Sequence, residues 1–129
     1  MRILIIEDSD SIRHMIEALV RASGHAVEAV PTGVKGIERA LAQPPDAILL
    51  DLHLPGGFDG FEVCRRLRDE ESTRAVPIIV ISALNDDASK QRALEAGATA
   101  YYTKPFSPTA LLKEINWIPV RESARAPVK

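Results

Sequence analysis

Four short apolar runs in this chain each end directly in a polar residue that can carry chemistry. Three of the runs are rich in Ile, Leu and Val and are apolar at every position, which is typical of parallel strands covered on both faces. In such a sheet the carboxyl ends of the strands meet at one crevice. We therefore expect the residues after the runs to converge: Glu7 and Asp8 after Ile3–Ile6, Asp51 after Ala47–Leu50, Ser82 after Ile78–Ile81, and Lys104 after Ala100–Thr103.

Between the runs the chain carries the periodicity and end signals of helices. An amphipathic stripe from Ile12 to Val20 stops at Gly24, and a further strand, His25–Val30, ends at Pro31. Caps, glycine and prolines mark four further helices. We expect them from Thr32 to Pro44, after the Asp59 and Glu62 capping box, from Asn85 or Asp86 to Gly97, and from Ser107 to Pro119. Five strand–helix units with short connections predict an α/β fold, a doubly wound five-stranded parallel sheet with helices on both faces.

The apolar positions of the expected helices predict which sides face the sheet. In the helix after Thr32 we expect Val34, Ile37 and Leu41 to point inward. Cys64 is expected to pack on a helix face, and Trp117 to be a partly exposed packing residue.

The composition limits the classes of protein that the chain can belong to. Its 129 residues suit one domain that can bury a core without disulfides or metals. The net charge of −2 gives no reason to expect direct nucleic-acid binding, and no apolar stretch is long enough to span a membrane. The single cysteine suits a reducing compartment. We therefore expect a cytoplasmic protein that binds neither membrane nor nucleic acid directly.

The blocks at the ends of the apolar runs resemble the receiver domain of two-component response regulators, in order and in spacing. They are Glu7-Asp8, Asp51-Leu-His-Leu-Pro, Ser82-Ala83 and Lys104-Pro105-Phe106. The chain is similar to the chemotaxis-type single receiver. The resemblance implies a flavodoxin-like strand order of 2-1-3-4-5. It also implies a receiver domain at residues 1–118. The segment after it, 119–129, is polar and contains proline, so we expect a disordered tail or the start of a linker there.

The residue types fit a phosphoryl acceptor. An incoming phosphoryl group carries about two negative charges, and three carboxylates packed together repel one another until a hard divalent cation such as Mg²⁺ binds between them. The resemblance implies that Asp8 and Asp51 bind Mg²⁺ by their side chains, His53 by its backbone carbonyl, and Glu7 mainly through a metal-bound water.

The same resemblance assigns the remaining roles. Asp51 is the phosphoacceptor, Lys104 supplies positive charge to the phosphoryl oxygens, and Ser82 donates its hydroxyl. Ser82 and Tyr101 are the switch residues, and Tyr102 should point to the other side of its strand. The chain would then be a regulatory phosphoacceptor, catalysing only its own phosphorylation and dephosphorylation.

The implied partners are a histidine kinase or a histidine phosphotransfer protein. Phosphorylation is expected to remodel the face made by the fourth helix, fifth strand and fifth helix, which would serve a target or a homodimer. The sequence leaves open whether the chain is a stand-alone receiver or part of a longer regulator.

Two other functions remain open from the residues. A haloacid-dehalogenase type of phosphatase also uses an Asp nucleophile, but it needs a second aspartate at the position where this chain has His53. A pseudo-receiver that serves only for interaction would be expected to lack Asp8, Asp51 or Lys104, and all three are present.

The chain departs from the family pattern at two points. The Pro55–Gly60 loop is one residue longer than usual, which predicts a slightly displaced third helix and a more mobile loop. Position 82 holds serine instead of the commoner threonine, so its hydroxyl rotates more freely and the switch should be less sharply two-state.

Overall fold

The computed structural model describes residues 1–118 as one parallel sheet between two layers of helices. The strands are β1 (Arg2–Ile6), β2 (Ala26–Val30), β3 (Ala47–Leu50), β4 (Ile78–Ser82) and β5 (Ala100–Thr103). The helices are α1 (Asp10–Ala22), α2 (Gly33–Ala42), α3 (Gly60–Asp69), α4 (Asp87–Ala96) and α5 (Pro108–Trp117). The strand order β2-β1-β3-β4-β5 confirms the predicted fold class and topology. The tail or linker expected at residues 119–129 lies outside the described residues.

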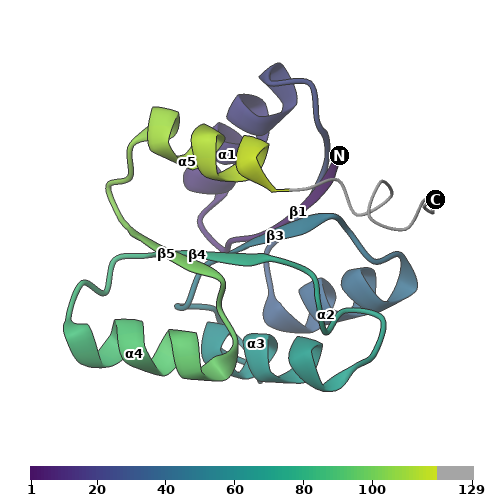
Figure 1. The fold of residues 1–129 in the computed structure, drawn as a ribbon, viewed down its shortest axis with the longest axis vertical. Helices are drawn as coiled ribbons and strands as arrows, with labels where there is room; N and C mark the ends of the chain where they lie inside the picture. The colour runs from purple at the N-terminus through teal and green to yellow at the C-terminus, as the bar shows by residue number, and fades with distance from the viewer. Residues whose placement is uncertain (119–129) are drawn as a thin grey trace.

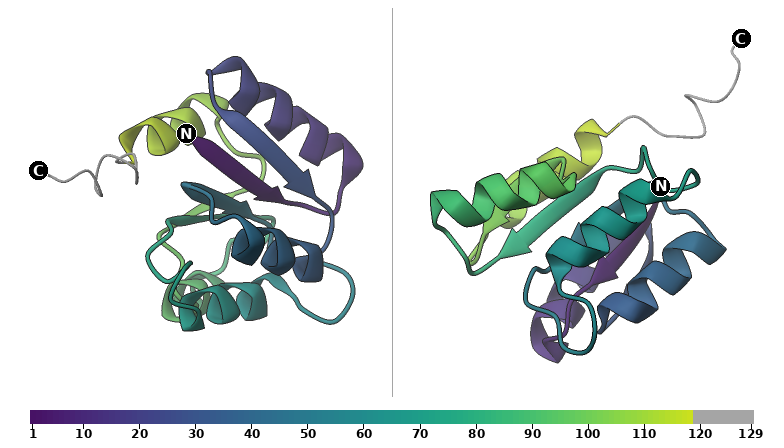
Figure 2. Two further views of the ribbon diagram at one scale, coloured as in Figure 1. Left: turned by 90° about the vertical axis from the view of Figure 1, so that its right-hand side faces the viewer. Right: turned by 90° about the horizontal axis from the view of Figure 1, so that it is seen from below.

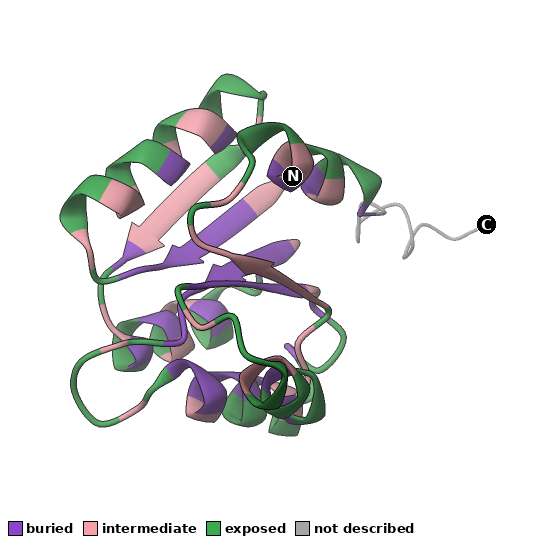
Figure 3. Ribbon diagram, turned by 90° about the vertical axis from the view of Figure 1, so that its left-hand side faces the viewer, coloured by how far each residue is buried: buried purple, intermediate pink, exposed green. Residues whose placement is uncertain are grey.

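The two helical layers enclose separate cores, which alternate along each strand. Helices α1 and α5 lie together on one face of the sheet, and α2, α3 and α4 cover the other (Figures 1 and 2). In β1, Leu4 and Ile6 belong to the core under α2–α4, whereas Ile3 and Ile5 belong to the core under α1 and α5. The central strands are almost fully buried and the edge strands β2 and β5 are partly exposed (Figure 3). The unbroken apolar runs are thus explained by burial on both faces.

Side-chain caps set the helix starts that the sequence predicted. Asp59 accepts a hydrogen bond from the Glu62 N–H at 2.9 Å, as the capping box requires. Of the two candidates for the start of α4, Asp86 is the N-cap and accepts from the Ser89 N–H at 2.9 Å. Gly97 ends the same helix with a φ of 116°, a left-handed conformation that favours glycine.

The predicted inward face of α2 was wrong. Val34 is 49% exposed and Leu41 is 37% exposed, while Gly36 and Ala40 are buried against the sheet. A Cβ at Gly36 would overlap a side chain of β1, so the helix lies too close to the sheet for large residues on that side. Ile37 alone of the predicted set packs against the core. The spacing of small residues, not of large ones, marks the buried side of this helix.

The end of α5 also differs from the prediction. Trp117 is 85% exposed and was expected to be partly packed. It lies on the opposite side of the helix from the buried residues Leu111 and Ile115, because two further residues turn the helix by about 200°. Cys64, by contrast, is buried in the core as predicted. Within residues 1–118, no helix combines the length and apolar character needed to cross a membrane.

Candidate functional site

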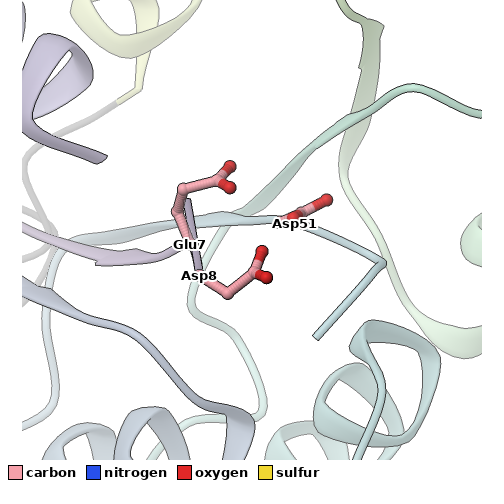
Figure 4. A group of neighbouring side chains, drawn as sticks. All are labelled: Glu7, Asp8 and Asp51. Atoms are coloured by element: carbon pink, nitrogen blue, oxygen red, sulfur yellow. The ribbon is translucent and has the colours of Figure 1, made fainter. Parts of the chain in front are cut away.

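Three carboxylates meet at the carboxyl end of the sheet. Ile6 pairs with Leu50 in the parallel ladder, so the residues that follow, Glu7 and Asp51, leave their strands side by side. One carboxylate oxygen from each of Glu7, Asp8 and Asp51 lies within 4.8 Å of the others. Figure 4 shows Glu7 and Asp8 at the end of β1 with Asp51 beside them. The predicted convergence of the acidic residues is therefore present in the fold.

Lys104 brings a positive charge to this cluster from β5. Its Nζ atom lies 3.0 Å from Glu7 Oε1 and 3.6 Å from Asp51 Oδ2. The backbone N–H of Lys104 donates to the carbonyl of Ser82 at 2.7 Å, which extends the pairing of β4 with β5 by one residue. The lysine side chain is only 18% exposed. The ammonium group is thus held between two carboxylates, and it is not a solvated surface charge.

Burial and charge repulsion raise the pKa of Asp51 to about 7. Loss of hydration on burial is the larger cause, and the neighbouring Glu7 carboxylate adds to it. Lys104 and the His53 N–H, which donates to Asp51 Oδ1 at 3.2 Å, act in the opposite direction. Without a cation, Asp51 therefore titrates near neutral pH, and bound positive charge would favour its carboxylate form.

The donor set fits Mg²⁺. Every acidic ligand is a carboxylate oxygen, the ligand type that hard divalent cations prefer. When all three are ionised, Glu7, Asp8 and Asp51 carry three negative charges against one positive charge on Lys104, which leaves a net charge of −2 for a cation to compensate. Asp8 is exposed, so a cation that keeps several water molecules can be accommodated. His53 contacts the cluster through its backbone N–H, which donates to Asp51, while the residue itself is exposed.

Ser82 and Tyr101 are joined through a residue that the sequence did not suggest. The buried Ser82 Oγ accepts a hydrogen bond from the Leu84 N–H at 3.1 Å, and the Tyr101 hydroxyl donates to the Leu84 carbonyl at 2.7 Å. Tyr101 packs against the core under α2–α4 and Tyr102 against the other core, so the two tyrosines point to opposite faces as predicted. No side-chain pattern could have revealed Leu84, because both of its bonds use backbone atoms.

The loop after Asp51 is fixed at its far end by Gly60. The Gly60 N–H donates to the Leu52 carbonyl at 3.0 Å, and a Cβ at position 60 would lie 2.5 Å from the Asp51 carbonyl oxygen. Phe58 packs against the core, and the Arg66 guanidinium lies 4.1 Å from the centre of its ring. Higher mobility of this longer loop stays a prediction. Gly60 could have been noticed from its place directly after the Asp59 cap.

Comparison with known proteins agrees with this architecture. Residues 3–116 match the response regulator receiver domain. The transcriptional regulatory protein CseB of Streptomyces coelicolor is 43% identical over 114 residues, which are 88% of this chain and 47% of CseB. Protein PilH of Pseudomonas aeruginosa is 34% identical over 115 residues, which are 89% of this chain and 94% of PilH. The chain thus spans about half the length of CseB and nearly all of PilH.

A solved structure extends the agreement to the fold. The receiver domain of a sensor histidine kinase from Pseudomonas aeruginosa, which has a magnesium ion coordinated in its active-site cleft, superposes with a TM-score of 0.84. It is 36% identical, and the alignment covers 91% of this chain and 96% of that domain. The family match covers almost all described residues, and the strand order β2-β1-β3-β4-β5 is the one that the receiver resemblance implied. The chain therefore belongs to the response regulator receiver domain family.

Proposed function

We propose that this chain is a phosphorylation-activated signalling switch. It accepts a phosphoryl group on Asp51, in a Mg²⁺-dependent reaction, from a histidine kinase or a histidine phosphotransfer protein. The observation that carries the proposal is the position of Asp51, which has Glu7 and Asp8 within 4.8 Å and the Lys104 ammonium 3.6 Å from its Oδ2. An acceptor carboxylate needs compensating positive charge, and this arrangement can supply it from two sources.

The transfer step follows from the residue chemistry. A carboxylate oxygen of Asp51 forms a bond to phosphorus while the bond from phosphorus to the donor histidine nitrogen breaks, which gives an acyl phosphate. Asp51 must be ionised to attack, and Lys104 stabilises charge on the phosphoryl oxygens. The side chains of Asp8 and Asp51, the His53 backbone carbonyl and, through water, Glu7 would hold Mg²⁺. When bound, Mg²⁺ neutralises the carboxylates and the phosphoryl oxygens.

The switch is proposed to run through the bonds to Leu84. If the Ser82 hydroxyl turns to donate to a phosphoryl oxygen, its bond with the Leu84 N–H at 3.1 Å must change. Tyr101 shares the same residue through its 2.7 Å bond to the Leu84 carbonyl, so a shift of this loop alters the packing of Tyr101. We infer that Tyr101 turns inward and that two packings exchange population.

The output surface is proposed to be the switch face, which we define as α4, β5 and α5. A target protein or a second copy of the chain would bind there. Because the proposed phosphoryl donors are a kinase or a phosphotransfer protein, we propose that the chain acts in the cytoplasm and contacts neither nucleic acid nor membrane directly. The chain acts only on itself, as a phosphoacceptor that also loses its phosphoryl group by hydrolysis.

The proposal is tested by intact-mass measurement after incubation with acetyl phosphate and Mg²⁺. We expect one phosphate adduct in the wild-type chain, none in Asp51→Asn, and none when EDTA removes the metal. Asp87→Asn, which changes an aspartate in the first turn of α4, is the matched control and should keep the adduct. An adduct that persists in Asp51→Asn, or that forms equally well with EDTA, would contradict the proposal.

A further inference from the structure

Arg13, in the first half of α1, reaches back to the loop that carries the acidic residues. Its Nη1 atom donates to the Glu7 carbonyl at 3.0 Å and lies 3.4 Å from the Asp8 carbonyl. Its Nη2 atom donates to Asp10 Oδ1 at 2.5 Å. The side chain is 14% exposed. Helical side chains lean toward the N-terminus, which explains how a residue inside the helix can reach the preceding loop.

The position of this arginine is unfavourable for the helix alone. The N-terminal end of a helix carries partial positive charge, so cations are stabilising at the C-terminal end, where Arg21 lies. Arg13 instead places a cation near the N-terminus, where the carbonyls of Glu7 and Asp8 and the Asp10 carboxylate compensate for it. Asp10 pairs with Arg13 inside α1, at i and i+3, whereas the two carbonyls that Arg13 also contacts belong to the preceding acidic loop.

Asp8 is the member of the cluster with the least support of its own. Glu7 Oε1 contacts Lys104, and Glu7 Oε2 accepts from the Ser9 N–H at 3.2 Å. Within residues 1–118, the Asp8 carboxylate receives no hydrogen bond. The placement of the Asp8 carboxylate therefore depends on where the Asp8 backbone lies, and Arg13 is the side chain that bonds the backbone carbonyls at this turn.

We propose that Arg13 is a positioning residue for the metal site. By bonding the carbonyls of Glu7 and Asp8, it fixes the turn after β1 so that the Asp8 carboxylate faces Asp51. Arg13 would touch neither the metal nor the phosphoryl group. This inference rests on the Mg²⁺ site of the proposed function, but it can be tested without phosphorylation.

The direct test is Mg²⁺ affinity, measured by isothermal titration calorimetry. Residues that orient metal ligands typically change affinity by 10- to 100-fold, and we expect Arg13→Ala to weaken Mg²⁺ binding by about tenfold. Arg13→Lys keeps a cation that can reach one carbonyl but not bridge two, so an intermediate affinity is expected. Arg21→Ala, which breaks an ion pair with Glu17 in the same helix, is the matched control and should bind like the wild type.

A kinetic readout separates positioning from a loss of structure. The Mg²⁺ concentration for half-maximal phosphorylation should rise about tenfold in Arg13→Ala, while the rate at saturating Mg²⁺ stays within about twofold. If Arg13→Ala does not fold, Arg13→Gln, which retains one amide donor, takes its place in both measurements. Wild-type Mg²⁺ affinity in a folded Arg13→Ala or Arg13→Gln chain overturns the inference.

Failure of the inference can be told apart from failure of the proposed function. Absence of Mg²⁺ binding in the wild-type chain overturns both. Weakened Mg²⁺ binding in Arg13→Ala, together with no phosphate adduct on the wild-type chain, supports the positioning role and contradicts the phosphoacceptor role.

Discussion

The site has two halves that are built differently, with the central strands β1 and β3 on one side and the edge strand β5 with α4 on the other. On the carboxylate side, β1 and β3 are buried almost completely, and Glu7 and Asp51 leave them from adjacent positions in the ladder. On the switch face, every residue of β5 is only partly buried, and α4 buries just Ala93 and Ala96. Regions with few buried apolar contacts open at lower free energy than the core. We therefore expect the proposed acceptor site to be more rigid than the neighbouring switch face.

Lys104 links the two halves, so its removal should have the largest effect. We expect Lys104→Ala to slow phosphorylation by acetyl phosphate about 100-fold or more, because loss of one preorganised charge-stabilising group has that magnitude. Lys104→Arg should also be defective, since a planar guanidinium cannot replace a compact ammonium between Glu7 and Asp51. The exposed Lys35 offers a control, and Lys35→Ala should react like the wild type. Unchanged phosphorylation kinetics in Lys104→Ala would contradict a role for Lys104 at the acceptor site.

The raised pKa of Asp51 predicts how metal-free stability depends on pH. Its folded-state pKa of about 7 lies above the ordinary value of 3.8, so the folded chain binds more protons between these values. Stability should therefore fall as pH rises from about 4 to about 7 and then level off. Asp51→Asn lacks this cost, and above pH 7 it should be more stable by up to about 4 kcal/mol, since one pKa unit corresponds to about 1.4 kcal/mol.

Chemical denaturation of both proteins across this pH range, in EDTA, gives the difference. Groups common to the two proteins cancel, so the gap should open between about pH 4 and pH 7. Mg²⁺ should close part of it by stabilising the wild-type chain, because the cation favours the Asp51 carboxylate. A difference in the free energy of unfolding that stays constant with pH would contradict the raised pKa of Asp51 as its cause.

Gly60 and Gly57 test the rigidity of the acceptor loop within one segment. A Cβ at Gly60 would lie 2.5 Å from the Asp51 carbonyl oxygen, whereas a Cβ at Gly57 meets nothing within 4 Å. We expect Gly60→Ala to lower the free energy of unfolding by about 2–3 kcal/mol through overpacking. Gly57→Ala should change it by less than about 0.5 kcal/mol. Denaturant unfolding of Gly60→Ala and Gly57→Ala measures both free energies of unfolding. Equal values would mean that the loop adjusts to a Cβ at either position and is not rigid.

The sequence predicted the rigid half better than the remainder. Uninterrupted apolar runs and the polar residues that end them were enough to place Glu7, Asp8 and Asp51 together. The carboxyl ends of parallel strands lie at the same edge of a sheet, so residues that directly follow neighbouring strands must be close. The face of α2 was predicted wrongly, since the pattern of Val34 and Leu41 does not report how closely a helix approaches the sheet. Leu84 could not be predicted, because its contacts use backbone atoms whose partners depend on the folded loop.

The account is tested most directly by amide hydrogen exchange with and without beryllofluoride, which mimics the aspartyl phosphate. Mg²⁺ should be present in both samples. We expect altered protection in residues 83–112, which include the Leu84 loop, α4 and β5, while the core amides of β1 and β3 stay protected throughout. The same comparison in Asp51→Asn should show no change. Changes confined to α1 and α2, with residues 83–112 unaffected, would contradict the proposal that phosphorylation at the rigid half repacks the switch face.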